Sequence, residues 1–185
     1  MTGGRPYRVL CLCGSLRGVS SNRALLEAAR QLAPVDMLLD LYDGLAQLPL
    51  FNPDAEIEPL PPPVQALRTA VGTSDALLIA CPEYAHGIPG AFKNLLDWLV
   101  GSLEFPDKPV LQVNASGRDS HHAQAALREV LVTMSARMLT DEPLGVPLPG
   151  AGCEVDFILD EPVRRGAVQA MLAVLSTRLA AVAGG

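Results

Sequence analysis

Short, almost uninterrupted apolar runs alternate along this chain with stretches in which apolar residues recur every three or four positions. The runs YRVLCLC, DALLIAC and KPVLQVNAS, at residues 7–13, 75–81 and 108–116, have the composition of strands that are buried on both faces. VDMLLDLY at 35–42 is a more amphipathic strand, and a fifth is expected within 136–148. This alternation predicts an α/β fold, a doubly wound five-stranded parallel sheet with helices on both faces.

Three stretches between these runs have helical periodicity, and each carries one apolar stripe that we expect to face the core. The stripes are Leu25, Leu26, Ala29, Leu32 and Ala33; Phe92, Leu95, Leu96, Leu99 and Val100; and Ala126, Leu127, Val130, Leu131 and Met134. A last helix is expected over 162–182, with Pro162 in its first turn, where proline is tolerated. The proline-rich stretch 54–64 is interpreted as a surface connection that leads into a short helix.

Length and charge narrow the possible functions. The 185 residues are enough for one ordinary domain. Charged residues make up 18% of the chain and the formal net charge is -6, so we expect no basic face and no nucleic-acid partner. The N-terminal stretch MTGGRPYRVL has no long apolar segment, and no window of about 18 consecutive apolar residues occurs. These observations predict a cytoplasmic protein with no membrane partner.

The four cysteines, Cys11, Cys13, Cys81 and Cys153, are interpreted as reduced thiols, three of which lie inside apolar runs or at their ends. A redox pair formed by Cys11 and Cys13 is the alternative. The two side chains would share one face of a strand, but no histidine or lysine flanks them to lower their pKa values. The sequence therefore favours core cysteines over a dithiol centre.

Polar and glycine-rich loops follow three of the expected strands. They are GSLRGVSSN at 14–22, CPEYAHGIPG at 81–90 and NASGRDSHH at 114–122. In a doubly wound fold, ligands bind beyond the carboxyl ends of the strands, where such loops converge. The three loops are therefore predicted to form one site.

The first loop predicts a phosphate site at the start of a helix. Ser15, Ser20, Ser21 and Asn22 are neutral hydrogen-bond donors and Arg17 is a planar, charged one, a set that suits a single terminal phosphate. The loop lacks the Gly-Lys-Ser/Thr ending of nucleoside-triphosphate loops and the GxGxxG pattern of dinucleotide folds. Asp40, near the end of the second strand, nevertheless keeps open a dehydrogenase that binds a dinucleotide.

Three segments resemble the NADPH-dependent FMN reductases of flavodoxin-like fold, a family with chromate-, quinone- and azo-dye-reducing members. GSLRGVSSNR resembles the family's phosphate loop, LPLFNPDAE its segment after the second strand, and PEYAHGIPGAFKNLLDWL its flavin-ring loop with the following helix. The resemblance implies one FMN-binding domain over residues 1–185 and a homodimer or homotetramer. The cofactor-binding residues that the loop chemistry and the resemblance together indicate are Ser15, Arg17, Ser20, Ser21 and Asn22 at the phosphate, Pro82, Glu83, Tyr84 and Ala85 along the ring, and Ser116 and Gly117 on its other side.

The chain departs from the family pattern at two places. Ala85 stands where many relatives have asparagine, so a side-chain amide contact to the flavin is missing. His121 and His122 enter a helix where many relatives have paired glycines, so the cofactor contacts of the third loop are not extended beyond Gly117. These histidines and His86 are interpreted as surface or loop-packing residues, and no metal site is expected, because adjacent residues of a helix face different directions.

The activity implied by the resemblance is hydride transfer from NADPH or NADH to FMN and then to a flavin, a quinone or a similar acceptor. Such chemistry needs stacking geometry and exclusion of water but no acid–base triad, so no catalytic side chain is predicted. Nicotinamide and acceptor would use the same open ring face in turn, which predicts ping-pong kinetics. An FMN-binding electron carrier and a regulatory flavin-binding module are the alternatives.

Overall fold

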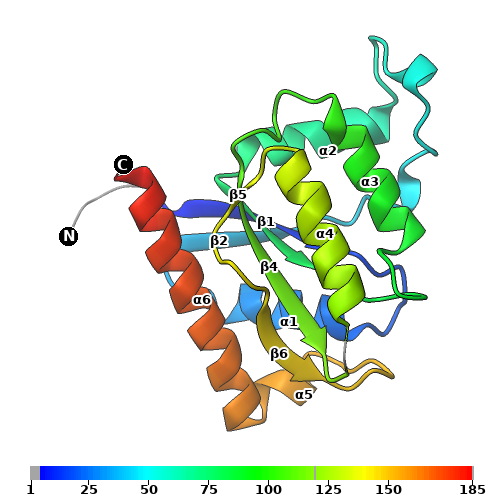
Figure 1. Cartoon of the computed structure of the whole chain (residues 1–185). Coiled ribbons are helices and arrows are strands. Elements are labelled where there is room, and N and C mark those ends of the chain that lie inside the picture. Colours follow the sequence, from blue (N-terminus) through cyan, green and yellow to red (C-terminus); the bar gives the residue numbers. More distant parts are fainter. Residues whose placement is uncertain (1–4, 119, 185) are drawn as a thin grey trace.

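The structure is a computed structural model that describes residues 5–118 and 120–184. Its centre is a parallel sheet with the strand order β2-β1-β3-β4-β5, in which β6 also pairs with β4 (Figure 1). The strands are β1 (Tyr7–Cys13), β2 (Met37–Leu41), β3 (Ala76–Ala80), β4 (Pro109–Ser116), β5 (Arg137–Met138) and β6 (Leu144–Leu148). The predicted fold class is confirmed, because this is the flavodoxin-like order of a doubly wound sheet.

The fifth position of the sheet is filled by two short strands instead of the single strand that we expected. β5 pairs with Pro109 and Val110 of β4, and β6 pairs with β4 further along, from Val113 to Ser116. The residues between the two strands, 139–143, contain Pro143, which has no N–H for a strand ladder. In the same segment the Thr140 hydroxyl donates to the carbonyl oxygen of Glu142 at 2.7 Å, which closes a local turn.

Helices cover both faces of the sheet (Figure 1). On one face lie α1 (Ser21–Gln31), α5 (Asp156–Leu159) and α6 (Pro162–Ala183), and on the other α2 (Pro62–Thr73), α3 (Gly90–Val100) and α4 (His121–Thr133). Two short 3-10 turns, η1 (Leu45–Gln47) and η2 (Pro53–Ala55), lie between β2 and α2. The expected start of the last helix and the helix after the proline-rich stretch are both present.

Two members of the predicted stripes do not face the core. Val100 is the last residue of α3 and is 62% exposed, whereas Leu95, Leu96 and Leu99 of the same helix are buried. Ala126 of α4 is exposed as well. The buried residues of α4 are Ala123, Gln124, Leu127 and Leu131. The buried face of α4 therefore includes a glutamine, which hydropathy periodicity could not select.

One described helix, α6, is long and apolar enough to span a membrane by length and composition alone, which the sequence analysis did not anticipate. One side of it packs into the core through Val168, Met171, Leu172, Leu175 and Leu179. One such helix alone is weak evidence for a membrane segment, because the core helix of a soluble protein passes the same test.

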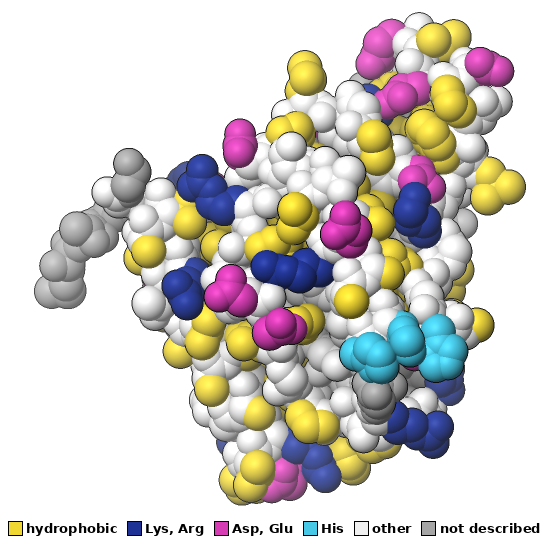
Figure 2. Space-filling view, in the orientation of Figure 1, with side chains coloured by type: hydrophobic (Ala, Val, Ile, Leu, Met, Phe, Trp, Pro, Cys, Tyr) yellow, Lys and Arg dark blue, Asp and Glu magenta, His cyan; other side chains and the backbone are white. Residues whose placement is uncertain are grey.

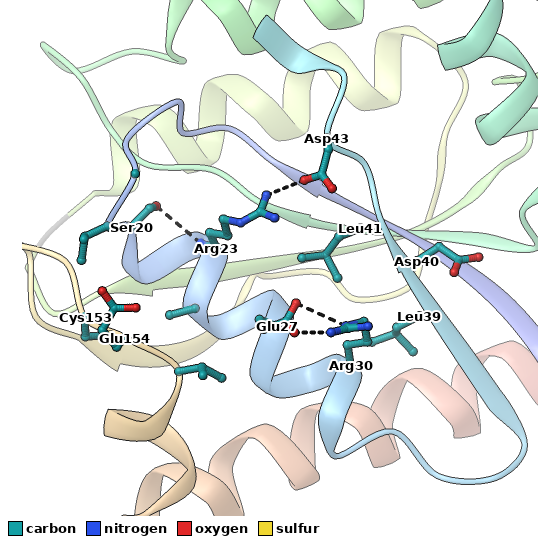
Figure 3. A pocket seen from close by; sticks show the side chains of 14 residues that line it. Ser20, Arg23, Glu27, Arg30, Leu39, Asp40, Leu41, Asp43, Cys153 and Glu154 are labelled. Carbon is teal, nitrogen blue, oxygen red and sulfur yellow. Dashed lines mark hydrogen bonds and ion pairs between the residues drawn. The ribbon is translucent and has the colours of Figure 1, made fainter.

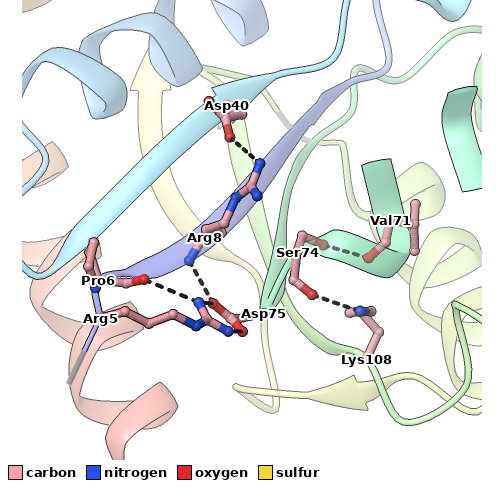
Figure 4. A network of polar contacts seen from close by, with 8 residues as sticks. All are labelled: Arg5, Pro6, Arg8, Asp40, Val71, Ser74, Asp75 and Lys108. Carbon is pink, nitrogen blue, oxygen red and sulfur yellow. Dashed lines mark hydrogen bonds and ion pairs between the residues drawn. The ribbon is translucent and has the colours of Figure 1, made fainter. Parts of the chain in front are cut away.

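A polar network fixes the amino-terminal edge of the sheet, opposite the loops that the sequence singles out (Figure 4). The Arg5 guanidinium donates to both carboxylate oxygens of Asp75 at 2.7 Å, and the backbone N–H of Arg8 donates to Asp75 at 2.8 Å. The hydrogen bonds from Arg5 are the main reason that the pKa of Asp75 lies below its usual value. Lys108 Nζ donates to the Ser74 carbonyl oxygen at 2.8 Å, which adds the start of β4 to the network.

All four cysteines are buried and none forms a disulfide. Burial raises the pKa values of Cys11, Cys13 and Cys81, because a desolvated thiolate is unfavourable. Cys11 and Cys13 lie together in the core between the sheet and α1 and α6. This confirms the interpretation of the cysteines as buried thiols.

Candidate functional site

The loops after β1, β3 and β4 meet where the strand order reverses direction. From β1 the chain passes through α1 to β2 on one side, and from β2 through α2 to β3 on the other side of β1. The ends of β1 and β3 are bonded to each other, since the Gly14 N–H donates to the Ala80 carbonyl oxygen at 2.9 Å. This is the topological switch point at which doubly wound folds bind ligands.

Gly14 is required by the close approach of these two strand ends. A Cβ atom at this position would lie 2.6 Å from the Cys81 sulfur and 3.1 Å from the Cys81 Cα. A larger residue would therefore push apart the loops that follow β1 and β3.

A cavity of about 220 Å³ opens between the loops. Nine of the predicted cofactor-binding residues line it: Ser15, Arg17, Ser20, Ser21, Asn22, Pro82, Glu83, Tyr84 and Ser116. Ala85 and Gly117 are not among the lining residues. The structure thus brings together residues from three loops that are separated by about 100 positions in the sequence.

The first loop has the geometry of an anion site at the start of a long helix. Ser20 is the N-cap of α1, and its hydroxyl accepts from the Arg23 N–H at 3.4 Å. The Ser15 hydroxyl accepts from the Arg17 N–H at 3.2 Å, which folds the loop back toward the helix. The first turn of α1 therefore opens into the cavity with the positive end of its dipole.

The cavity has basic side chains and a buried amide oxygen without a hydrogen-bond partner among the described residues. These features fit a phosphorylated ligand with hydroxyl groups, such as FMN. Arg17 and Arg118 are the basic residues of the lining, and Glu83 is its acidic residue. Asn22 is buried, and within the described residues its side-chain oxygen has no hydrogen-bond partner. A buried amide without a partner beside a cavity is costly for the protein alone, and a ligand with polar groups relieves this cost.

The second loop contains a tight two-residue turn. Tyr84 and Gly87 exchange backbone hydrogen bonds of 3.1 and 3.0 Å, and the residues between them, Ala85 and His86, have φ values of 50° and 60°. This left-handed conformation strains an alanine, whereas asparagine and glycine tolerate it. The asparagine that the family resemblance leads us to expect in place of Ala85 would therefore also suit the backbone of this turn.

The Glu83 side chain lines the cavity and is also hydrogen-bonded to the start of α4. One of its carboxylate oxygens accepts from the Ala123 N–H at 2.9 Å, and the other lies 3.2 Å from His86 Nδ1. The position of Glu83 suits the positive end of the α4 dipole. Its role in the protein alone is therefore to join the second loop to the start of α4.

Three histidines gather on the surface beside this loop (Figure 2). The ring centroids of His86 and His122 are 4.5 Å apart, and those of His121 and His122 are 3.9 Å apart. All three residues are exposed, as the sequence predicts. Within residues 5–118 and 120–184, no group of histidine, cysteine and acidic residues has the arrangement of a metal site.

The third loop turns close against β6. The Gly117 N–H donates to the Leu148 carbonyl oxygen at 3.1 Å, and a Cβ atom on Gly117 would lie 2.9 Å from that oxygen. Asn114 Oδ1 accepts from the Ser116 N–H at 2.9 Å and from the Ser120 hydroxyl at 3.1 Å. Asp119, which lies between Arg118 and Ser120 in the predicted loop, is outside the described residues.

Sequence reasoning missed the segment that closes the cavity over the first loop. Pro149, Gly150 and Gly152, which follow β6, line the cavity, and the Pro149 carbonyl oxygen accepts from the Ser21 hydroxyl at 2.6 Å. Arg118, Ser120, Asn114, Ala115 and Cys81 also line it without having been singled out. The glycines and prolines after the fifth strand were an available signal, because that strand ends at the same edge of the sheet as β1.

A second hollow of about 350 Å³ adjoins the cavity through Arg17 and Tyr84. The exposed side chains of Leu16 and Tyr84 border it, and so do three residues at the start of α3, Pro89, Gly90 and Ala91. The small residues at the end of the second loop and the start of α3 thus leave open space next to the predicted ring position.

A larger hollow of about 500 Å³ lies on the other side of α1 and is lined by charged residues (Figure 3). Arg23 pairs with Asp43 at 2.7 Å, and Arg30 pairs with Glu27 on the same helix. Asp40, the residue that could imitate a ribose-binding acid, lies 3.6 Å from the Arg8 guanidinium. The charges of this hollow are therefore largely paired within the protein.

The sequence profile of the NADPH-dependent FMN reductase family matches residues 7–147. An NAD(P)H-dependent FMN reductase of Pseudomonas aeruginosa is 38% identical over 136 residues, which are 71% of this chain and 73% of that protein. A quinone reductase of Escherichia coli is 33% identical over 137 residues, again 71% of this chain and 73% of that protein. Among solved structures, the flavoenzyme NAD(P)H:(acceptor) oxidoreductase FerB of Paracoccus denitrificans superposes with a TM-score of 0.71 and 25% identity, over 93% of this chain and 98% of that one.

Proposed function

The chain belongs to the NADPH-dependent FMN reductase family, whose members are oxidoreductases that use FMN and NAD(P)H, and from this we propose that it reduces a quinone or flavin acceptor with electrons from NAD(P)H by a ping-pong mechanism. The observation that carries the proposal is the convergence of nine predicted residues on one cavity at the β1–β3 switch point.

The phosphate of FMN would be bound by the first loop. Arg17 supplies charge, Ser15, Ser20 and Ser21 supply hydroxyl groups, and the first turn of α1 adds the positive end of its dipole. Asn22, also predicted at the phosphate, would donate to it through its amide nitrogen. Its amide oxygen, which has no partner within the described residues, would accept from a hydroxyl group of the adjoining polar chain.

The ring would lie between the second and third loops. Pro82, Glu83 and Tyr84 border it on one side and Ser116 on the other. Ala85 and Gly117 stay predicted neighbours of the ring, because their loops reach the cavity although they are not among its lining residues. FMN supplies the hydride chemistry when it is bound, and the protein orients the reactants and excludes water around them.

The hollow beside Leu16 and Tyr84 suits two flat substrates that bind in turn. Its apolar walls and the small residues at the start of α3 favour stacking of a nicotinamide or a quinone over bonding of a strongly polar group. One opening for both substrates excludes their simultaneous binding, so parallel lines are expected in double-reciprocal plots. We also propose a cytoplasmic homodimer or homotetramer, in keeping with the family resemblance.

Anaerobic titration of the purified protein tests the proposal. The protein should be yellow, lose its colour with NADPH or NADH, and regain it with a quinone or free flavin. Bound FMN that neither nucleotide reduces would support an electron carrier or a regulatory flavin-binding module instead. A protein that binds a nicotinamide dinucleotide and no flavin would be a dehydrogenase in which the first loop holds a pyrophosphate.

A further inference from the structure

Two glutamines form a buried amide pair beneath the second loop. Gln112 of β4 is 1% exposed and Gln124 of α4 is 5% exposed. Gln112 Nε2 donates to Gln124 Oε1 at 2.7 Å and to the Gln124 carbonyl oxygen at 2.9 Å. Within the described residues, Gln112 Oε1 has no partner. The pair therefore leaves one acceptor unsatisfied in the core between the sheet and α4.

Burial of such a pair needs a physical reason, because amides lose more by desolvation than apolar side chains do. On the face of the sheet that α4 covers, Ile79 pairs with Gln112 and Val110 lies two residues before it, and both are fully buried. Leu127 and Leu131 continue the buried face of α4. Apolar side chains would thus suit the surroundings of both glutamines. One contact of the pair could not be made by an apolar side chain. Gln124 Nε2 donates to the Cys81 carbonyl oxygen, outside the pair itself, at 3.1 Å.

The Cys81 carbonyl is the first one after β3, at the start of the second loop. The β3 strand ends at Ala80, whose carbonyl already accepts from Gly14, and Pro82 follows Cys81 directly. Cys81 is 2% exposed, so its carbonyl oxygen depends on a donor from inside the protein. Gln124 is that donor.

A second bond joins the next part of the loop to the neighbouring residue of α4. The Ala123 N–H donates to the Glu83 carboxylate at 2.9 Å. Two consecutive residues of the first turn of α4 therefore hold both Cys81 and Glu83, and Gly14 contacts Cys81 from the opposite side. The three residues that lead into the turn at Tyr84 are thus held between α4 and the first loop.

We propose that Gln124, oriented by Gln112, is a positioning residue that fixes the backbone of residues 81–84 against the ring of FMN. The inference rests on the proposed FMN site. It assigns to the amide pair the function of holding the backbone of the second loop in place, which apolar residues could not do because they have no hydrogen-bond donor. Displacement of this backbone would change both the affinity for FMN and the surroundings of its ring.

Two variants separate positioning from core stability. Gln124→Met removes the donor to Cys81 and leaves Gln112 with an unpaired amide, so its unfolding midpoint should fall. The double variant Gln112→Met with Gln124→Met replaces both partners by flexible apolar chains of similar length, so its midpoint should recover. In both variants the Kd for FMN should rise by about threefold to tenfold, the range for one neutral hydrogen bond. The visible circular dichroism of bound FMN, which reports the protein surroundings of the ring, should change equally in both.

Ser74→Ala is the matched control. It removes a buried hydrogen bond, from the Ser74 hydroxyl to the Val71 carbonyl oxygen at 2.8 Å, far from the second loop at the opposite edge of the sheet. It should lower the unfolding midpoint without changing the dichroism or the affinity for FMN. A double Met variant with wild-type affinity and dichroism would overturn the inference while leaving the proposed function intact. Absence of FMN binding by the unaltered protein would instead remove the proposed function, and this inference with it.

Discussion

The Arg17 guanidinium donates to the carbonyl oxygen of Ala151 at 2.8 Å, across 134 positions of sequence. This bond joins the loop after β1 to the segment after β6. Together with the bond from Ser21 to Pro149, it closes the cavity on the side of α1. Arg17 is therefore already oriented along the wall of the cavity by the protein itself, which reduces the entropy that a bound phosphate would have to offset.

Arg17→Ala should weaken binding of FMN far more than binding of riboflavin, because riboflavin has no phosphate. A charge-assisted hydrogen bond contributes about 1.5–3 kcal/mol, so we expect the Kd for FMN to rise by about tenfold to a hundredfold in fluorescence titrations. Arg165→Ala, which removes an exposed arginine of α6, is the control and should change neither affinity. Equal weakening for both flavins would contradict a phosphate contact of Arg17.

Ala85→Asn should stabilise the flavin-free protein. The φ of 50° at Ala85 is costly for alanine and is better tolerated by asparagine, so the free energy of unfolding should rise by about 0.5–1 kcal/mol in urea denaturation. The same exchange at Ala126, an exposed position inside α4, should lower it by several tenths of a kcal/mol through helix propensity. A loss of stability with Ala85→Asn would show that this turn is not strained.

Replacement of Cys11 and Cys13 by alanine should change stability and not turnover. Both thiols are buried in the core and their pKa values are raised, so neither is a thiolate at neutral pH. Each change should cost about 1–2 kcal/mol of unfolding free energy, while the rate of NADPH oxidation per bound flavin stays unchanged. A protein that keeps its flavin and its fold but loses turnover would revive the dithiol alternative.

Asp75→Asn should remove part of the acid dependence of stability. The pKa of Asp75 is lower in the folded protein than in the unfolded chain, so the carboxylate stabilises the fold above its unfolded value of about 3.9. This contribution is lost as the pH falls from that value through the folded pKa. We therefore expect the variant to lose about 1 kcal/mol at pH 7, mainly through weaker bonds to the Arg8 N–H and Arg5, and to lose less stability than the parent on acidification.

Urea denaturation at a series of pH values between 2 and 7 measures this difference, with about 0.3 kcal/mol as the resolution that is needed. Asp141→Asn, at an exposed position between β5 and β6, is the control. If Asp75→Asn and the parent protein lose the same unfolding free energy between pH 7 and pH 2, other carboxylates cause the acid dependence of stability.

The features that the sequence predicted correctly depend on local pattern. The strands β1, β3 and β4 are mostly apolar because both of their faces are covered, and their ends are marked by Gly14, Pro82 and Gly117. The loops at those ends were predictable because parallel strands place their carboxyl ends at one edge.

The features that it missed depend on contacts between distant parts of the chain. The split into β5 and β6 follows from their pairing with β4, and the segment 149–152 reaches the cavity only because β6 lies beside that strand. Gln124 is a polar residue that can be buried because it is hydrogen-bonded to Gln112 and to Cys81. A hydropathy pattern reveals neither of these two bonds. The left-handed φ of Ala85 is equally hidden, since alanine does not signal such a turn.

The bonds from Arg17 and Ser21 to the segment after β6 also order the events of biosynthesis. The predicted phosphate loop leaves the ribosome early, but its bonding partners are synthesised about 130 residues later. A nascent chain that ends before residue 149 has the helix start and the arginine without the wall that holds them in place. Capture of a phosphorylated ligand by this loop would therefore follow the synthesis of residues 149–151, and a truncation before residue 149 would impair a predicted site whose most recognisable residues are 15–22.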